Sequence, residues 1–206
     1  MDQHRLNIAH IAASLTPPEG RSFAGTSDFD FNPEWRPAEP PRLRAASVLV
    51  PLVARRGGPR VVLTRRAARL RHHPGQIAFP GGKQDPGDPT ALDAALREAW
   101  EEIGLPPGAV TILGSFDRHE TVTRFSVTPF VGLVAPGFEP RIDPSEVEEV
   151  FEVPLAFLVD PAHRRRHRRV WGGGSREYLA IPYGPYYIWG ATARMLARLG
   201  DRIGGP

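Results

Sequence analysis

The 206-residue sequence contains no cysteine, and its only lysine is Lys83. Without cysteine the chain can form no disulfide, and thiol catalysis and cysteine-ligated metal sites are excluded. Its longest apolar runs, such as SVLVPLV and FVGLVA, fall far short of the ~20 residues that a membrane-spanning helix needs. The N-terminus MDQHRLNIAHIAASL has no continuous apolar stretch, so it lacks the pattern of a secretory signal. We expect a cytoplasmic protein that does not bind membranes, although a lack of cysteine fits any compartment.

The charges are nearly balanced, because 26 basic residues face 23 acidic ones and leave a net charge of only +3. An excess this small argues against a dedicated nucleic-acid-binding protein. Arginine binds phosphate groups in a bidentate manner, so an anionic small-molecule ligand fits the arginine-rich composition. Codon bias explains that richness equally well, and we favour it for the composition as a whole.

The length suits one domain with appendages, and 41% apolar residues are enough for one core. We expect an N-terminal helix and proline-containing arm over 1–44, a main domain over 45–200 and a tail over 201–206. The aromatic residues of the arm predict that it packs on the main domain. Strands are predicted at 45–55, 59–66, 76–82, 109–119 and 124–135, with a hairpin turn at 57–59.

The remaining segments predict further helices, a second hairpin and one loop. Helices are expected at 89–103, at 144–150 and at 186–199, where Gly200 would end the last one. A second hairpin is expected over 168–183, and the basic run 163–169 is interpreted as a solvated loop rather than a nucleic-acid site. Trp171, Tyr186, Tyr187 and Trp189 are expected to be core or dimer contacts, which leaves a homodimer open. Mixed strands and helices indicate an α/β sandwich.

The helix predicted at 89–103 combines an apolar stripe with a cluster of acidic residues. Asp88 and Pro89 are expected to provide its N-cap and its first residue. Glu98, Glu101 and Glu102 have a spacing that places them within about 100° of each other on another face. Like charges this close destabilise an exposed helix, and clustered carboxylates suit Mg²⁺ or Mn²⁺. A solvated acidic face is the alternative, and for the three glutamates alone we favour it.

The segment FPGGKQDPGD, immediately upstream, changes this balance. Its glycines Gly81 and Gly82 allow a tight turn in which the backbone can approach a ligand closely. Asp85 and Asp88 add two carboxylates to the loop that leads into the helix. The unit is therefore a strand, a glycine turn, an acidic loop and a helix with three carboxylates on one face, and a metal site becomes the better interpretation.

The stretch GGKQDPGDPTALDAALREAWEEIGL resembles the signature of the Nudix hydrolases, G-x5-E-x7-R-E-U-x-E-E-x-G-U, where U is aliphatic. The second half is kept, through Arg97, Glu98, Ala99, Glu101, Glu102, Gly104 and Leu105. In the first half, Asp88 replaces a glutamate, and one extra residue precedes Arg97. The resemblance implies a Nudix-type α/β/α sandwich with a mixed β-sheet and a loop–helix–loop catalytic motif.

A second motif resembles the coenzyme A pyrophosphatase branch of this family, L-L-T-x-R-S-x-x-L-R-x-H-x-G-Q-[IV]-x-F-P-G-G. The stretch VLTRRAARLRHHPGQIAFPGG matches it at Leu63, Thr64, Arg66, Leu70, Arg71, His73, Gly75, Gln76, Phe79 and Pro80. Ala67 stands where serine is usual, so one hydroxyl that could meet the ligand is missing. The resemblance covers about residues 45–199, and the N-terminal arm lies outside it.

The resemblance also implies roles for individual residues. Glu98, Glu101 and Glu102 would bind Mg²⁺ or Mn²⁺, and Glu101 or Glu102 would orient or deprotonate the attacking water. Arg97 would position the glutamates, and Glu146 would be an extra metal ligand or base, or else a solvated residue. The expected substrate contacts are Arg66, Arg71, His73, Gln76, Gly81 and Gly82.

Three functions are compatible with these motifs. The leading one is metal-dependent hydrolysis of coenzyme A or an acyl-CoA to 3′,5′-ADP and 4′-phosphopantetheine. The second is hydrolysis of another dinucleotide such as ADP-ribose or NADH, which the missing serine at Ala67 supports. The third is a non-catalytic Nudix-fold module that senses a nucleotide or binds a protein, and the presence of all three glutamates disfavours it.

Overall fold

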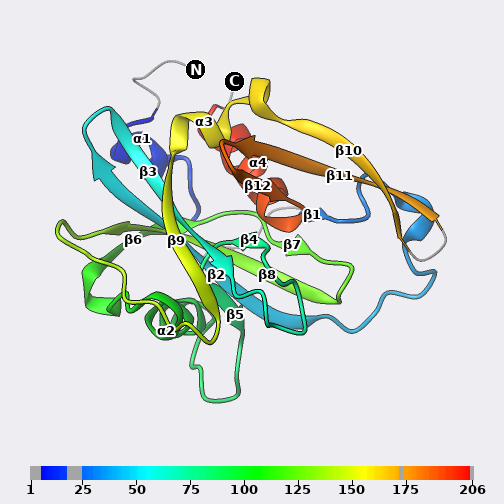
Figure 1. Cartoon of the computed structure of the whole chain (residues 1–206), viewed down its shortest axis with the longest axis horizontal. Coiled ribbons are helices and arrows are strands. Elements are labelled where there is room, and N and C mark those ends of the chain that lie inside the picture. The colour runs from blue at the N-terminus through cyan, green and yellow to red at the C-terminus, as the bar shows by residue number, and fades with distance from the viewer. Residues whose placement is uncertain (1–5, 18–24, 172–173, 205–206) are drawn as a thin grey trace.

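The computed structural model describes residues 6–17, 25–171 and 174–204 (Figure 1). Within these ranges the main sheet has nine strands: β1 (Thr26–Ser27), β2 (Arg44–Arg55), β3 (Gly58–Arg66), β4 (Ile77–Ala78), β5 (Gly81–Lys83), β6 (Val110–Ser115), β7 (His119–Glu120), β8 (Phe125–Val134) and β9 (Val147–Pro154). A separate antiparallel sheet contains β10 (Arg165–Trp171), β11 (Gly174–Tyr183) and β12 (Tyr186–Trp189). The helices are α1 (Ile8–Ala13), α2 (Ala91–Ile103), α3 (Leu155–Val159) and α4 (Ala191–Ile203), with 3₁₀ turns at Pro33–Trp35, Pro107–Ala109 and Pro161–His163.

The main sheet is mixed. Its central strand β2 pairs in parallel with β8 and antiparallel with β3, and it also pairs with β5. Strand β9 joins the sheet through β3, and β6 joins it through β8. Helix α2 covers one face, and α1, α3 and α4 lie on the other (Figure 1). This arrangement confirms the predicted α/β sandwich.

Alternating side chains along the strands produce two hydrophobic clusters. In β3, Val61 and Leu63 point into the cluster shared with α3 and α4, whereas Val62 points into the cluster under α2. This period of two is the geometry expected of a strand buried on both faces. In the described part of the chain, we find no helix that combines the length and the apolar character needed to cross a membrane.

Several predicted elements are confirmed. The first hairpin joins β2 and β3, but Arg55 pairs with Gly58, so the turn residues are Arg56 and Gly57. The strand predicted at 76–82 is interrupted and forms β4 and β5. The strands predicted at 109–119 and 124–135 correspond to β6, β7 and β8.

Helix α2 begins later than predicted. Thr90, rather than Asp88, is its N-cap, and Thr90 and Asp93 form a reciprocal capping box. The Asp88 carboxylate instead accepts two hydrogen bonds from Arg97, at 2.8 and 3.0 Å. Gly104 ends the helix as predicted, in the left-handed conformation with φ of +67°.

The prediction of a helix at 144–150 is wrong. Residues from Val147 onward form β9, which pairs antiparallel with β3. The spacing of the acidic residues favoured a helix locally. However, the backbone N–H and C=O groups along one edge of β3 need hydrogen-bond partners, and this segment supplies them. Tertiary pairing therefore outweighs the local pattern.

The prediction for the C-terminal helix is wrong at both ends. Residues Tyr186–Trp189 form β12, and the chain turns into α4 at Gly190, whose φ is +64°. Gly200 does not end α4, which continues to Ile203. A Cβ at Gly200 would lie 2.6 Å from the Val159 carbonyl oxygen, so this glycine lets α4 pack closely against α3.

The basic run 163–169 is not a loop, which corrects that interpretation. Its residues form most of β10, which pairs with β11 over its length. The side chains of Arg166 and Arg168 lie beside Glu177 on β11, and Arg168 donates to it at 2.6 Å. The arginines therefore stay exposed while their backbone is paired.

The described part of the arm packs on the main domain, as predicted from its aromatic residues. Phe29 is buried, and Phe31 packs against the larger cluster. Phe23 lies outside the described residues. The guanidinium of Arg194, on α4, lies 4.5 Å from the centroid of the Phe31 ring and pairs with Asp30.

Asp117 links the loop before β7 to α4, and its loss should destabilise the protein. Its side chain is 0% exposed and accepts hydrogen bonds from Arg198 and Arg202 at 2.7 to 3.0 Å. Burial opposes ionisation, but the two arginines outweigh it and hold the pKa of Asp117 below its usual range. We expect Asp117→Asn to lower the free energy of unfolding at pH 7 by about 3 kcal/mol in urea denaturation.

The stabilisation that Asp117 provides should be lost at low pH. A depressed carboxylate pKa stabilises the folded state above the unfolded pKa of about 4, and the contribution disappears as the pH falls through the folded pKa. The difference between wild type and Asp117→Asn should therefore shrink below about pH 4. Asp201→Asn is the control, because Asp201 pairs with Arg164 while 49% exposed. An Asp117→Asn variant as stable as this control would contradict the prediction.

Candidate active site

The candidate site forms where β5 and α2 meet beside the central strand. Gly81 and Gly82 pair with Val48 and Ser47 of β2, which brings the glycine turn onto the sheet. A Cβ at Gly82 would lie 2.5 Å from the carboxyl carbon of Glu98. Glycine is thus required for the helix carboxylate to lie against the strand backbone.

Glu102 is the most buried carboxylate of the site, with 2% of its surface exposed. It accepts a hydrogen bond from the Gly81 N–H at 3.2 Å, and its other oxygen lies 3.5 Å from Arg66. Burial raises the pKa of Glu102 to about 8, although the Gly81 N–H and Arg66 both act to lower it. A nearby cation would stabilise the ionised form of such a carboxyl group and lower its pKa.

Glu98 and Glu146 belong to the same electrostatic group. Burial raises the pKa of Glu98, and the charges of Glu101 and Glu146 contribute to the rise while Arg97 opposes it. The charges of Glu98 and Glu146 also raise the pKa of Glu102. Glu146 reaches the site from the segment before β9, where its carbonyl accepts a hydrogen bond from the Ala67 N–H at 2.8 Å. The structure therefore brings Glu98, Glu102 and Glu146 into one acidic region.

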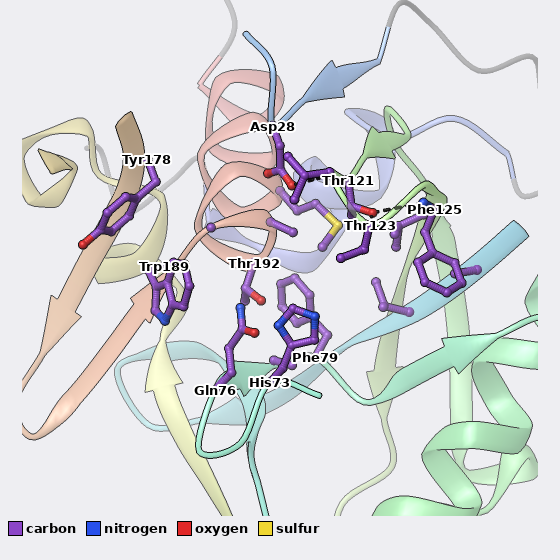
Figure 2. Close-up of a pocket in the computed structure, with 18 of the residues that line it drawn as sticks. Asp28, His73, Gln76, Phe79, Thr121, Thr123, Phe125, Tyr178, Trp189 and Thr192 are labelled. Carbon is purple, nitrogen blue, oxygen red and sulfur yellow. Dashed lines mark hydrogen bonds between the residues drawn. The ribbon is translucent and has the colours of Figure 1, made fainter. Parts of the chain in front are cut away.

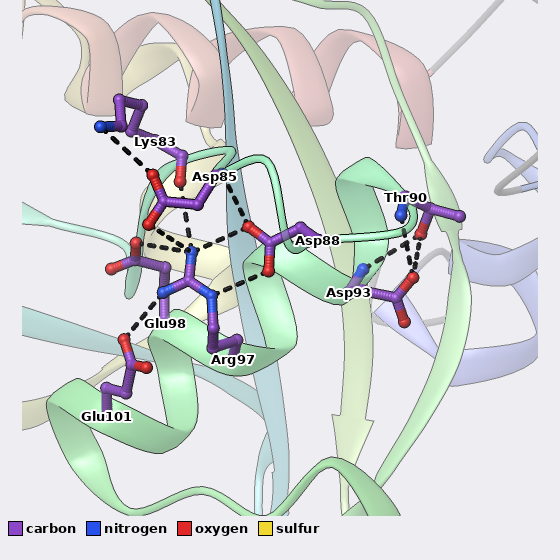
Figure 3. A network of polar contacts seen from close by, with 8 residues as sticks. All are labelled: Lys83, Asp85, Asp88, Thr90, Asp93, Arg97, Glu98 and Glu101. Carbon is purple, nitrogen blue, oxygen red and sulfur yellow. Dashed lines mark hydrogen bonds and ion pairs between the residues drawn. The ribbon is translucent and has the colours of Figure 1, made fainter.

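Arg97 lies among the remaining carboxylates (Figure 3). It pairs with Asp88 at 2.8 Å, with Glu98 at 3.1 Å and with Glu101 at 2.8 Å. The hydrogen bond from Arg97, followed by that from the Asp85 backbone, lowers the pKa of Asp88 to about 2. Glu101 is turned outward onto Arg97 and is 54% exposed. Arg97 has the contacts of a residue that positions the glutamates.

The donor set fits a divalent cation. In the ranges described, no three carboxylate or histidine side chains are already arranged as ligands of one ion. Mg²⁺ usually takes only one or two protein carboxylates and completes its shell with waters and substrate phosphates. Glu98 and Glu102 supply two such carboxylates, and burial raises the pKa of both although Arg97 and Arg66 lie beside them, so a cation would stabilise their ionised forms further.

A cavity of about 620 Å³, part of whose lining is drawn in Figure 2, lies next to residues that contact the carboxylates. Gly81, Gly82 and Arg66 line it, and these same residues contact Glu98 or Glu102. Its lining is mostly apolar and includes Phe79 and Met195. A cavity of this size and character, with a few polar groups at one side, is typical of a small-molecule site.

The structure brings most of the predicted substrate residues to this cavity, but not Arg71. Arg66, His73, Gln76, Gly81 and Gly82 line it. Arg71 is exposed and does not line the cavity, so it has no contact there to support its predicted role. His73 adopts a φ of +56°, and its carbonyl accepts from the Gln76 N–H, which closes the turn carrying both side chains.

Other cavity residues were not predicted as site residues. They come from the arm, from the loop after β7 and from the second sheet: Asp28, Phe29, Asn32, Trp35, Thr121, Thr123, Arg176 and Tyr178. No local motif marks them, because they converge only after the second sheet and the arm pack on the main domain. The aromatic composition of the arm was the one sequence signal that could have suggested them.

The aromatic residues near the C-terminus have different environments. Tyr186 stacks on Phe151 with a centroid separation of 3.6 Å, as expected for a core contact. Tyr187 is partly exposed, and its hydroxyl bonds to His167 and Tyr178. Trp189 lines the cavity rather than the core, which corrects the prediction for that residue. The Trp171 side chain lies outside the described part of the structure.

Solved structures with a similar backbone include an Ap4A hydrolase and a MutT protein. The binary complex of the Ap4A hydrolase, from Caenorhabditis elegans, has a TM-score of 0.47 and 21% identity, covering 54% of this chain and 80% of that one. The MutT protein, from Methanosarcina mazei, has a TM-score of 0.48 and 20% identity, covering 81% of this chain and all of that one.

Sequence comparisons give the family. The sequence profile of the NUDIX domain matches residues 43–171. A protein of Cronobacter sakazakii named "Uncharacterized Nudix hydrolase NudL" is 43% identical over 169 residues, covering 78% of this chain and 83% of that protein. Its namesake from Salmonella paratyphi B is 42% identical over 161 residues, with the same coverage. The chain therefore belongs to the Nudix family, as a hydrolase of pyrophosphate bonds in nucleoside diphosphate derivatives.

Proposed function

We propose that the protein hydrolyses the pyrophosphate bond of coenzyme A or an acyl-CoA, giving 3′,5′-ADP and 4′-phosphopantetheine. The observation that supports this most is the junction between the two motifs. Arg66, which belongs to the motif resembling the coenzyme A branch, lies 3.5 Å from Glu102 of the Nudix helix. The same cavity is lined by His73 and Gln76 of that branch motif. Arg66 therefore connects the two motifs, because it lines the cavity and also lies beside Glu102 of the carboxylate helix.

The proposed cofactor is Mg²⁺ or Mn²⁺, held by Glu98 and Glu102, with Glu101 or Glu146 completing the set. When bound, such a cation neutralises the pyrophosphate charge and makes the attacking water more acidic. The charge of Glu146 already raises the pKa of both Glu98 and Glu102. Glu101 would first have to leave its contact with Arg97.

The protein residues have separate tasks in this proposal. A glutamate, Glu101 or Glu102, accepts a proton from water as the water oxygen attacks phosphorus, and the bond to the bridging oxygen breaks. Glu102 is the better candidate for this role, because Glu101 is held by Arg97 and is 54% exposed. Arg66 and the Gly81 and Gly82 backbone, which line the cavity, would contact the phosphate oxygens.

The alanine at position 67 weighs little against the coenzyme A assignment. Ala67 is buried and does not line the cavity. A serine there would therefore not reach this space directly, and its absence removes no cavity contact. Hydrolysis of ADP-ribose or NADH is the second candidate, because these substrates share the adenosine diphosphate group.

A substrate panel tests the assignment. The purified protein, with Mg²⁺ or Mn²⁺, is incubated with coenzyme A, an acyl-CoA, ADP-ribose and NADH, and the products are separated by chromatography. We expect 3′,5′-ADP from the first two and much slower cleavage of the others. Cleavage of ADP-ribose but not coenzyme A would overturn the branch assignment alone. No cleavage of any pyrophosphate would overturn both enzyme functions and favour a non-catalytic module.

The proposal also includes a cytoplasmic location, a small-molecule nucleotide as the partner, and no nucleic acid or membrane as partners. A homodimer is part of the same expectation, and size-exclusion chromatography with light scattering measures it directly.

A further inference from the structure

The cavity is not built by the Nudix domain alone. The match to the NUDIX domain covers residues 43–171, but cavity residues also come from both sides of this range. Residues of the arm line it before the match, and residues of β11, β12 and α4 line it after the match. Figure 2 shows Asp28 of the arm above the pocket and, below it, His73 of the motif loop, which is the segment 67–76 between β3 and β4. The arm therefore forms the wall that faces the motif loop.

The arm is held in place by polar contacts to two other segments. Asn32 donates to the Glu177 carbonyl at 2.8 Å and accepts from the Glu177 N–H at 2.7 Å, so it pairs with β11 as a strand residue would. Asp28 contacts the buried His119 ring at 3.1 Å and accepts from the Val122 N–H at 3.0 Å. These contacts fix the arm against the second sheet on one side and β7 on the other.

Two aromatic rings, those of Phe29 and Trp35, give this wall its apolar surface. Trp35 packs so tightly on β11 that a Cβ at Gly174 would clash with its ring, and Arg176 lies 4.4 Å from the ring centroid. Phe29 adds a second ring to the lining. Both oxygens of the Asp28 carboxylate already have partners, so Asp28 offers little to a ligand.

We propose that arm residues 28–35, through the rings of Phe29 and Trp35, select substrates whose group beyond the pyrophosphate is largely apolar. Trp35 is the specificity-determining residue, and Asn32 is a positioning residue that holds Trp35 against β11. The inference rests on the proposed pyrophosphatase function, because it concerns the second end of the same substrate.

The first test replaces Trp35 and measures kcat and KM for an acyl-CoA and for ADP-ribose, with metal present. Loss of an aromatic contact should raise KM for the acyl-CoA in Trp35→Ala by about fivefold to tenfold, with kcat within about twofold. The ratio of kcat/KM between the acyl-CoA and ADP-ribose should fall by a similar factor. Trp35→Phe keeps a ring in the wall and should recover most of the wild-type KM.

The second test separates positioning from general loss of stability. Asn32→Ala removes both hydrogen bonds to β11 and should raise KM for the acyl-CoA while kcat changes little. Asn7→Ala is the matched control: Asn7 caps α1 through the His10 N–H, and it does not line the cavity. It should lower the thermal unfolding temperature without changing KM.

The outcomes distinguish this inference from the proposed function. Active wild type with unchanged KM and unchanged selectivity in both Trp35→Ala and Asn32→Ala would overturn the inference and leave the pyrophosphatase function standing. Wild-type preference for ADP-ribose over the acyl-CoA would overturn it as well, since the ribose is polar. Wild type that cleaves none of these substrates would overturn the proposed function and the inference with it.

Discussion

Glu102→Gln is expected to reduce kcat by about 10³-fold, the scale of effect that a lost general base has. Glutamine keeps the size of the side chain, and its amide can still lie beside Gly81, but it has no negative charge for a cation and accepts no proton from water. The fold should persist, because a neutral group at a site only 2% exposed is less costly to bury than a carboxylate. A single substitution should therefore separate catalysis from stability.

The measurement combines turnover of coenzyme A, circular dichroism and thermal unfolding on the same preparation. The unfolding temperature of Glu102→Gln without metal should be equal to or above that of wild type. Glu139→Gln is the matched control, because Glu139 is exposed and does not line the cavity. Full activity of Glu102→Gln would mean that the catalytic carboxylates lie elsewhere.

Gly81→Ala is expected to lower the free energy of unfolding by about 3 kcal/mol. The φ of Gly81 is +150°, a conformation that L side chains rarely adopt, and its Cβ would lie 2.5 Å from the Ser47 carbonyl oxygen and 2.6 Å from the Val48 Cα. Both atoms belong to the backbone of β2, so no side chain can move aside to relieve the clash. Relief would need β5 to separate from the central strand.

Urea denaturation measures this loss, and the same loop offers a matched control. A Cβ at Gly87 would meet no atom of the described residues within 4 Å, and the φ of Gly87 is not positive. Gly87→Ala should therefore stay within about 0.5 kcal/mol of wild type. Activity should fall in Gly81→Ala even in the folded fraction, because the Gly81 N–H donates to Glu102. Equal stability of the two variants would contradict the close packing of β5 on β2.

The catalytic unit could be predicted from local sequence, because its signals lie within one short segment. The Asp88–Pro89 pair placed the start of α2 to within two residues, the apolar period indicated the helix itself, and Gly104 marked its end. The spacing of Glu98 and Glu102 also follows from helical geometry alone. These features depend on neighbours in the chain, so they could be predicted without knowing the fold.

The direction in which each carboxylate points depends on tertiary packing. Glu101 has the same local environment in sequence as Glu102, yet it faces Arg97 and solvent, while Glu102 is buried beneath Gly81. The difference arises because β5 covers only one side of α2. Glu146, from a distant segment, joined the acidic region only when β9 paired with β3.

The same distinction explains the elements that were misplaced. The segments 144–150 and 163–169 are charged enough to suggest a helix and a loop, but residues 147–150 became part of β9 and residues 165–169 became part of β10, because each pairs with a neighbouring strand. Backbone pairing depends on a partner that is distant in sequence, so local propensity cannot reveal it.

Periodicity and short-range spacing were enough to predict the carboxylate helix and the α/β architecture, and the resemblance of two local motifs indicated the family. The rest of the cavity lining became known only from the packing of distant segments. Arm residues such as Trp35 and second-sheet residues such as Tyr178 and Trp189 line one cavity although they are far apart in the chain. Their convergence depends on long-range contacts, such as that between Asn32 and Glu177, which no local pattern encodes.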